Sequence, residues 1–167
     1  MDTLAHQLLV ATALVSATVM IHLIGLDLLQ AMLGWHLKRL TGWIHLDRMI
    51  VPLGIVLGLF VVHGAEIWLY AIVFWKAGLI QDLEHALYAS IGAYSTLGEA
   101  GPVLPTSWRI VGALEAINGM LLIGWSTAFL FQILSHLMWD EDSPQTLPRG
   151  AIARPSPRPR RSGRGAP

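Results

Sequence analysis

The chain has 167 residues, of which 54% are hydrophobic and only 13% are charged, and its formal net charge at pH 7 is zero. This composition is too apolar for an ordinary soluble domain, and the polar remainder is too short to hold an enzyme domain. The absence of cysteine excludes disulfides and thiolate metal sites. Phosphate-binding loops, nucleophile–base pairs and zinc motifs are also missing from the sequence. We therefore expect an integral membrane protein that is not an enzyme and has no nucleic-acid partner.

Three stretches are long enough to cross a bilayer, which takes about 20 apolar residues. They cover approximately residues 8–33, 50–75 and 110–139. The first lacks a basic start and is too long for the apolar core of a signal peptide. We therefore predict a retained N-terminal transmembrane helix over residues 1–34, with an interfacial helix as the alternative.

Basic residues predict the orientation of the spans. Residues 35–49 contain Lys38, Arg39 and Arg48, and residues 140–167 contain six arginines, whereas few basic residues separate the second span from the third. We therefore predict that 35–49 and 140–167 are cytoplasmic and that the N-terminus lies outside, in the plasma (inner) membrane. The Pro, Arg, Ser and Gly content of residues 140–167 predicts a disordered tail.

A shorter and more polar segment lies between the second and third spans. Apolar residues recur on one helical face over residues 82–95, and Asp82 is the expected N-cap. A proline-bounded loop, residues 95–106, follows. Non-helical backbone at membrane depth occurs only where protein buries it or where it lines a water-filled cavity. The segment therefore predicts a re-entrant pore helix, 82–95, and a filter loop, 95–106.

Several short motifs follow one another around this segment. They are Ala86-Leu87-Tyr88-Ala89-Ser90, Ser95-Thr96-Leu97-Gly98, Leu104-Pro105 ahead of Trp108-Arg109, Leu114-Glu115-Ala116 and the run 119–128. Over about residues 50–137 the chain resembles the two-transmembrane pore-loop potassium-channel family. The resemblance implies a pore domain, 50–139, with an outer helix, 50–75, and an inner helix, 107–139.

The same resemblance implies an all-α membrane fold that conducts cations passively as a homotetramer, because one pore loop cannot enclose an ion path. The implied partners are further copies of the chain, the lipid bilayer and permeant cations. The implied filter residues are Ser95, Thr96, Leu97, Gly98, Glu99 and Ala100. Gly119 and Gly124 correspond to gating hinges, although glycines here could instead serve close helix packing.

The second half of the filter departs from the family pattern, which continues Tyr-Gly-Asp where this chain has Glu99-Ala100-Gly101. Ala100 adopts a positive φ only with strain. Four Glu99 carboxylates around the outer mouth would favour cations over anions. We therefore expect a cation pathway with weak discrimination between K⁺ and Na⁺. The alternative is that Glu99 is a solvated acid in a non-conducting scaffold or subunit.

Three acids, Asp27, Glu66 and Glu115, lie within predicted spans. An acid at the bilayer centre costs about 2.5–3.5 kcal/mol, so such residues usually face protein or water. Helical spacing brings His63 close to Glu66, and Asn118 close to Glu115. We predict that these four residues form a polar cluster that supports the filter from behind the pore helix. Asp27 is nearer the cytoplasmic side and is a candidate partner for Lys38, Arg39 or Arg48.

Cofactor binding is the least favoured alternative. His63 and Glu66 are three residues apart, and such pairs bind metal in di-iron bundles, but those sites need Glu-x-x-His on two helices. His22, His63 and His136 could also serve as haem ligands in a membrane anchor. We expect no cofactor and no metal site, and a Soret band from the purified protein would contradict this.

Overall fold

The computed structural model describes residues 2–39, 44–98 and 104–139. These residues form helices joined by short links, with no strand among them. The elements in chain order are α1 (Asp2–Arg39), α2 (Ile44–Lys76), α3 (Leu83–Tyr94), the 3₁₀ turn η1 (Thr106–Trp108) and α5 (Arg109–Trp139). The predicted all-helical class is confirmed.

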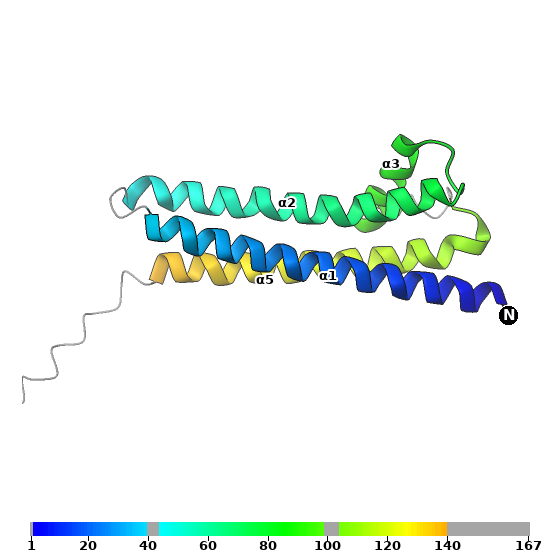
Figure 1. Cartoon of the computed structure of the whole chain (residues 1–167), viewed down its shortest axis with the longest axis horizontal. Coiled ribbons are helices and arrows are strands. Elements are labelled where there is room, and N and C mark those ends of the chain that lie inside the picture. The colour runs from blue at the N-terminus through cyan, green and yellow to red at the C-terminus, as the bar shows by residue number, and fades with distance from the viewer. Residues whose placement is uncertain (1, 40–43, 99–103, 140–167) are drawn as a thin grey trace, which may run out of the picture.

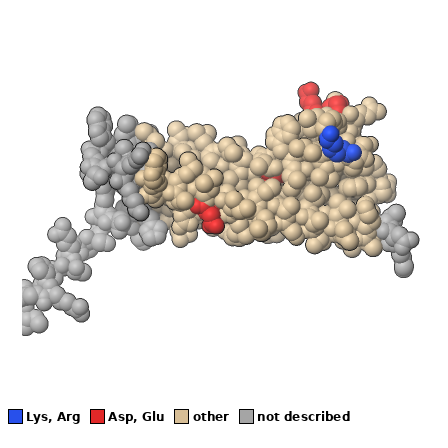
Figure 2. All heavy atoms as spheres, viewed as in Figure 1, with Lys and Arg blue, Asp and Glu red and all other residues tan. Residues whose placement is uncertain are grey.

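Three of the helices are long and apolar enough to cross a membrane. Their candidate spans are Leu4–Trp35, Ile50–Lys76 and Thr106–Ser135. The chain therefore has the helices of a multi-pass membrane protein. In Figure 2 the described part of the visible face is nearly free of charge along the helices, as a lipid-facing surface requires.

The ends of the first two helices differ from the sequence expectation. Residues 35–49 were expected to form a loop, but α1 continues to Arg39 and α2 begins at Ile44. The reason is physical: bilayer thickness limits the apolar stretch, not the helix, and Leu, Lys and Arg are good helix formers. The expected tail, 140–167, lies outside the described residues.

The three long helices run side by side, and α3 lies beside one end of α2 and α5 (Figure 1). The first turns of α1 lie at this same end, where the N–H of Ile110 donates to Gln7 Oε1 at 3.4 Å. The α1 helix packs against both α2 and α5. The N-terminal helix is therefore part of the bundle.

A layer of polar side chains interrupts the apolar interior. One apolar cluster, near α3, includes Leu14, Tyr70 and Val111, and the other includes Leu26, Ile55 and Ile133. Buried polar side chains lie between these positions on each long helix: Thr18 and His22 on α1, Glu66 on α2, and Glu115, Asn118 and Ser126 on α5. This polar layer is where α3 ends.

The end of α3 lies directly against α5 at Gly119. A Cβ atom at Gly119 would lie 2.4 Å from the backbone oxygen of Tyr94, which is too close for any side chain. Gly124 has nothing within 4 Å of a corresponding Cβ. Gly119 and Gly124, for which one role was expected, thus have different surroundings, and of these two it is Gly119 that lies at a close helix contact.

We predict that Gly119→Ala lowers the stability of the fold by about 1–3 kcal/mol, because backbone must move to admit the methyl group. Thermal unfolding in detergent, followed by helical circular dichroism, measures this. Gly124→Ala is the matched control and should be neutral or slightly stabilising, since alanine is the better helix former. Equal stability of the two variants would contradict the packing role of Gly119.

Candidate functional site

The N-terminus of α3 is capped as the sequence predicts. Asp82 has extended backbone angles, φ −129° and ψ 159°, and its Oδ1 accepts a hydrogen bond from the backbone N–H of His85 at 2.8 Å. Asp82 Oδ2 lies 2.7 Å from His85 Nδ1. The N–H of His85 holds the pKa of the Asp82 carboxyl below its usual range. The Asp82 side chain, through its hydrogen bond, raises the pKa of His85.

The C-terminus of α3 closes in a Schellman motif. The N–H of Thr96 donates to Ala93 O and the N–H of Leu97 donates to Gly92 O, both at 2.9 Å. This geometry requires a left-handed residue after the cap, and Thr96 takes that position with φ 62°. Glycine usually stands here, since a β-branched residue in this region is strained.

The inner face of α3 binds two buried acids from two different helices. Ser90 Oγ lies 2.5 Å from Glu115 Oε1 on α5 and 2.9 Å from the backbone oxygen of Ile67 on α2. One turn further along α3, the Tyr94 hydroxyl donates to Glu66 Oε2 on α2. These two contacts attach α3 to both of the helices that flank it.

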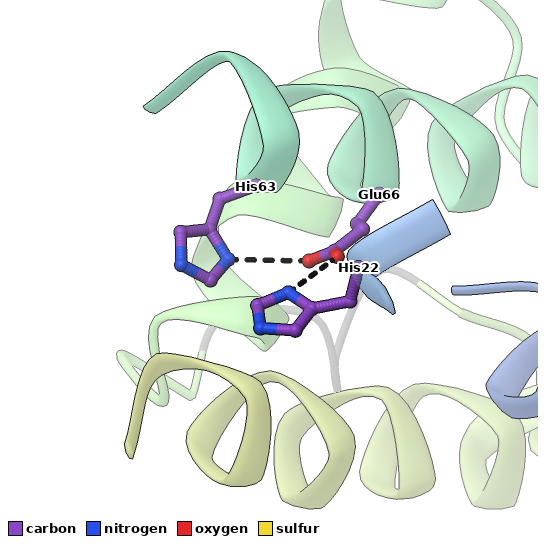
Figure 3. A group of neighbouring side chains, drawn as sticks. All are labelled: His22, His63 and Glu66. Carbon is purple, nitrogen blue, oxygen red and sulfur yellow. Dashed lines mark hydrogen bonds and ion pairs between the residues drawn. The ribbon is translucent and has the colours of Figure 1, made fainter. Parts of the chain in front are cut away.

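Glu66 lies at the centre of a cluster to which α1 contributes His22 (Figure 3). His22 Nδ1 lies 2.9 Å from Glu66 Oε1, and His63 Nδ1 lies 3.2 Å from Glu66 Oε2. His63 Nδ1 is also 2.8 Å from the Tyr94 hydroxyl. The side chains of His22 and Glu66 are completely buried, and that of His63 is 17% exposed.

The outer nitrogens of both imidazole rings face a single hydroxyl on α5. His63 Nε2 lies 3.0 Å from Ser126 Oγ, and His22 Nε2 lies 3.5 Å from the same atom. Side chains from α1, α2, α3 and α5 therefore meet in one polar cluster, which we call the Glu66 cluster: His22, His63, Glu66, Tyr94 and Ser126.

A second group of polar residues lies beside this cluster. Asn118 Nδ2 donates to Thr18 Oγ1 at 2.8 Å. Within the described part of the chain, the buried atoms Tyr70 OH and Glu115 Oε2 have no hydrogen-bond partner. This group links α1 to α5 next to the point where Ser90 binds Glu115.

The four residues predicted to support the filter are all placed at the polar layer, but in two groups. His63 and Glu66 meet at Tyr94, whereas Glu115 binds Ser90 and Asn118 binds Thr18 on α1. Sequence reasoning missed the contributions of His22, Ser126 and Thr18 to these groups. Their only signal was that each is a polar residue inside an apolar span.

The other candidate residues are placed as follows. Ser95, Thr96, Leu97 and Gly98 are described and exposed, whereas Glu99 and Ala100 lie outside the described residues. Asp27 is exposed. The side chains of its candidate partners, Lys38, Arg39 and Arg48, and that of His136, also lie outside the described part.

We predict that Thr96→Gly stabilises the protein by about 1–2 kcal/mol, because it removes the cost of a left-handed residue. Thermal unfolding in detergent measures the gain. Ser95→Gly is the matched control: Ser95 has a negative φ of −82° and its hydroxyl bonds Ile91 O. Ser95→Gly should therefore bring no gain, and a Thr96→Gly variant no more stable than the parent would contradict the strained cap.

The interaction between Asp82 and His85 should stabilise the fold only within a limited pH range. Because the pKa of His85 is raised in the folded state, its contribution to folding stability is lost as the pH rises through this raised pKa. Because the pKa of Asp82 is lowered in the folded state, its contribution to folding stability is lost as the pH falls through this lowered pKa. The stability difference between the parent and His85→Gln should therefore be largest between about pH 4 and pH 6.5 and shrink on either side. Thermal unfolding against pH tests this, with His6→Gln as the control; a flat difference would contradict it.

Comparison with known proteins adds no assignment to this geometry. No family model matches the chain, and neither a curated protein nor a solved structure matches it. Function must therefore be inferred from the short helix, its two caps and the buried cluster that holds it.

Proposed function

We propose that the protein is a passive cation channel whose ion path passes the C-terminal end of α3. Four copies around a central axis would enclose the path, with residues 95–100 as the filter and K⁺ or Na⁺ as the permeant ion. The protein would lie in the plasma (inner) membrane. Its N-terminus would be outside the cell, and residues 140–167 would be in the cytoplasm.

The length and position of α3 support a re-entrant segment. Its 12 residues make a helix about 18 Å long, too short for a hydrocarbon core of about 30 Å. Its cap at Asp82 is exposed, whereas Tyr94 at its other end is buried against Gly119, about 15 Å along α5 from Arg109. A short helix that runs from an exposed cap into the bundle is what a re-entrant segment requires, and this supports the proposal.

The backbone after α3 is the observation that carries the proposal. The N–H groups of Ser95, Thr96 and Leu97 all donate back into α3, at 2.9 Å each. Among the described residues none donates to their carbonyl oxygens, and residues 95–98 are exposed. Free carbonyls can replace the hydration shell of a cation. The partial negative charge at the C-terminus of a helix favours a cation at the same place.

A non-conducting membrane subunit is the second candidate, and the Schellman closure favours it. The closure folds Thr96 and Leu97 over the helix end, so that the first filter residues serve as a cap. A chain that keeps the short helix for assembly and no longer passes ions would need only this cap.

Ion flux into proteoliposomes separates the two candidates. We expect cation flux, and under opposed K⁺ and Na⁺ gradients a permeability ratio below about tenfold, which is about 1.4 kcal/mol. Glu99→Gln should reduce both the conductance and the preference for cations over anions, because it removes the acidic ring.

Glu84→Gln is the matched control, since Glu84 is an exposed acid in the first turn of α3. It should leave flux and selectivity unchanged. Strong K⁺ selectivity in the parent would contradict the weak-discrimination proposal. Folded, reconstituted protein without flux would favour the non-conducting subunit.

A further inference from the structure

The Glu66 cluster contains more hydrogen-bond contacts than it has protons to form them. A carboxylate only accepts hydrogen bonds, so His22 Nδ1 and His63 Nδ1, which both face Glu66, must each carry a proton. The Tyr94 hydroxyl proton is directed to Glu66 as well. In two neutral imidazoles, both Nε2 atoms are then acceptors.

Both of these acceptors face the same donor. His63 Nε2 and His22 Nε2 approach Ser126 Oγ, which has one proton to donate. One Nε2 lone pair therefore faces an oxygen with no proton between them, and His22 is completely buried. A buried acceptor without a donor costs about 1–3 kcal/mol. Two neutral rings thus leave the cluster incompletely paired.

The Glu66 cluster also lacks a positive charge to balance its carboxylate. The Glu66 carboxylate is fully buried, and its described partners are two histidines and a tyrosine. A buried charge is tolerated when it is paired or binds a metal. A cation at the centre of the cluster would supply the missing positive charge.

We propose that His22, His63 and Glu66 bind a divalent transition-metal ion, with the Tyr94 oxygen as fourth ligand. This inference goes beyond the proposed channel function and does not depend on it. The ion would accept the Nδ1 lone pairs of both rings and one Glu66 oxygen. Each ring would then carry its proton on Nε2, and the two Nε2–H groups would donate to the two lone pairs of Ser126 Oγ. Such outer hydrogen bonds commonly orient metal-bound histidines.

The donor set and spacing fit a small ion. Two imidazole nitrogens with oxygen ligands suit Zn²⁺ in tetrahedral geometry, and two histidines with one carboxylate also suit Fe²⁺. Tetrahedral bonds of about 2.0 Å hold ligand atoms about 3.3 Å apart. Here His22 Nδ1 lies 2.9 Å from Glu66 Oε1 and His63 Nδ1 lies 3.2 Å from Glu66 Oε2, and one ligand atom from each of the three residues lies within 4.8 Å of the others. The ligand atoms would therefore have to move toward a common centre to bind one ion.

The position of the site gives it a structural role. Its ligands come from α1, α2 and α3, so one ion would join three helices at the level where α3 ends. Tyr94 immediately precedes the cap of that helix. The ion would therefore hold the end of α3 against the bundle.

The metal content of the purified full-length protein tests this proposal. The protein carries an affinity tag without histidine, is incubated with Zn²⁺ and desalted, and is analysed by mass spectrometry for metal. We expect one tightly held ion per chain, lost in His22→Gln and Glu66→Gln. Ser126→Ala should weaken Zn²⁺ binding by about 10–100-fold, as loss of an outer hydrogen bond does elsewhere. His6→Gln is the matched control, because His6 is an exposed histidine on the same helix as His22.

A second measurement needs no variant that could misfold. Co²⁺ added to the wild-type protein should give the visible absorption of a tetrahedral nitrogen–oxygen site, and Zn²⁺ should displace it. Absence of bound Zn²⁺ and Co²⁺ in folded wild-type protein would overturn the proposal, as would equal metal content in His22→Gln and His6→Gln. Either result is independent of whether the protein conducts ions.

Discussion

The fold depends on how one buried carboxylate is paired. Glu66 lies fully buried in the interior of an apolar bundle, where a lone carboxylate would be strongly destabilising. Its pairing requires His22 from α1, His63 from one turn earlier on α2 and Tyr94 from α3. Satisfying this one group therefore constrains the rotation of α1 and the position of the C-terminal end of α3.

The second attachment of α3 completes the geometry. Ser90 and Tyr94 are four residues apart and so share a face, and they bind Glu115 and Glu66 respectively. Two attachments one turn apart fix both the depth and the direction of a helix, which a single contact could not do. The absence of a side chain at Gly119 allows the backbone of α3 at Tyr94 to lie directly against α5 beside these two attachments.

The parts of this structure that follow from local pattern could be predicted. Apolar length identified the three long helices, and Asp82 identified the start of α3. The pairing of His63 with Glu66 followed from their spacing on one helix. The polar layer across the bundle could not be derived in the same way, since His22 meets Glu66 from 44 positions away.

Helices that are apolar all round carry little information about which side faces a neighbour. This explains why the hydrogen bond from Asn118, which is three residues from Glu115 on α5, to Thr18 on α1 was not predicted. It also explains why Ser126 was overlooked, although its hydroxyl meets both histidines. The cap at Thr96 was hidden for a different reason: glycine is the usual signal for a left-handed residue, and here a threonine occupies that position.

The polar layer supplies what apolar packing cannot supply in a bilayer. Lipid tails are as apolar as leucine, so burying Leu26 or Ile55 between helices gains little over leaving them in lipid. Hydrogen bonds between Glu66, His22 and Tyr94 have no comparable substitute in lipid, and they therefore determine the register of the helices. Because Tyr94 stands directly before the cap that positions residues 95–98, the pairing of Glu66 bears directly on where that segment lies.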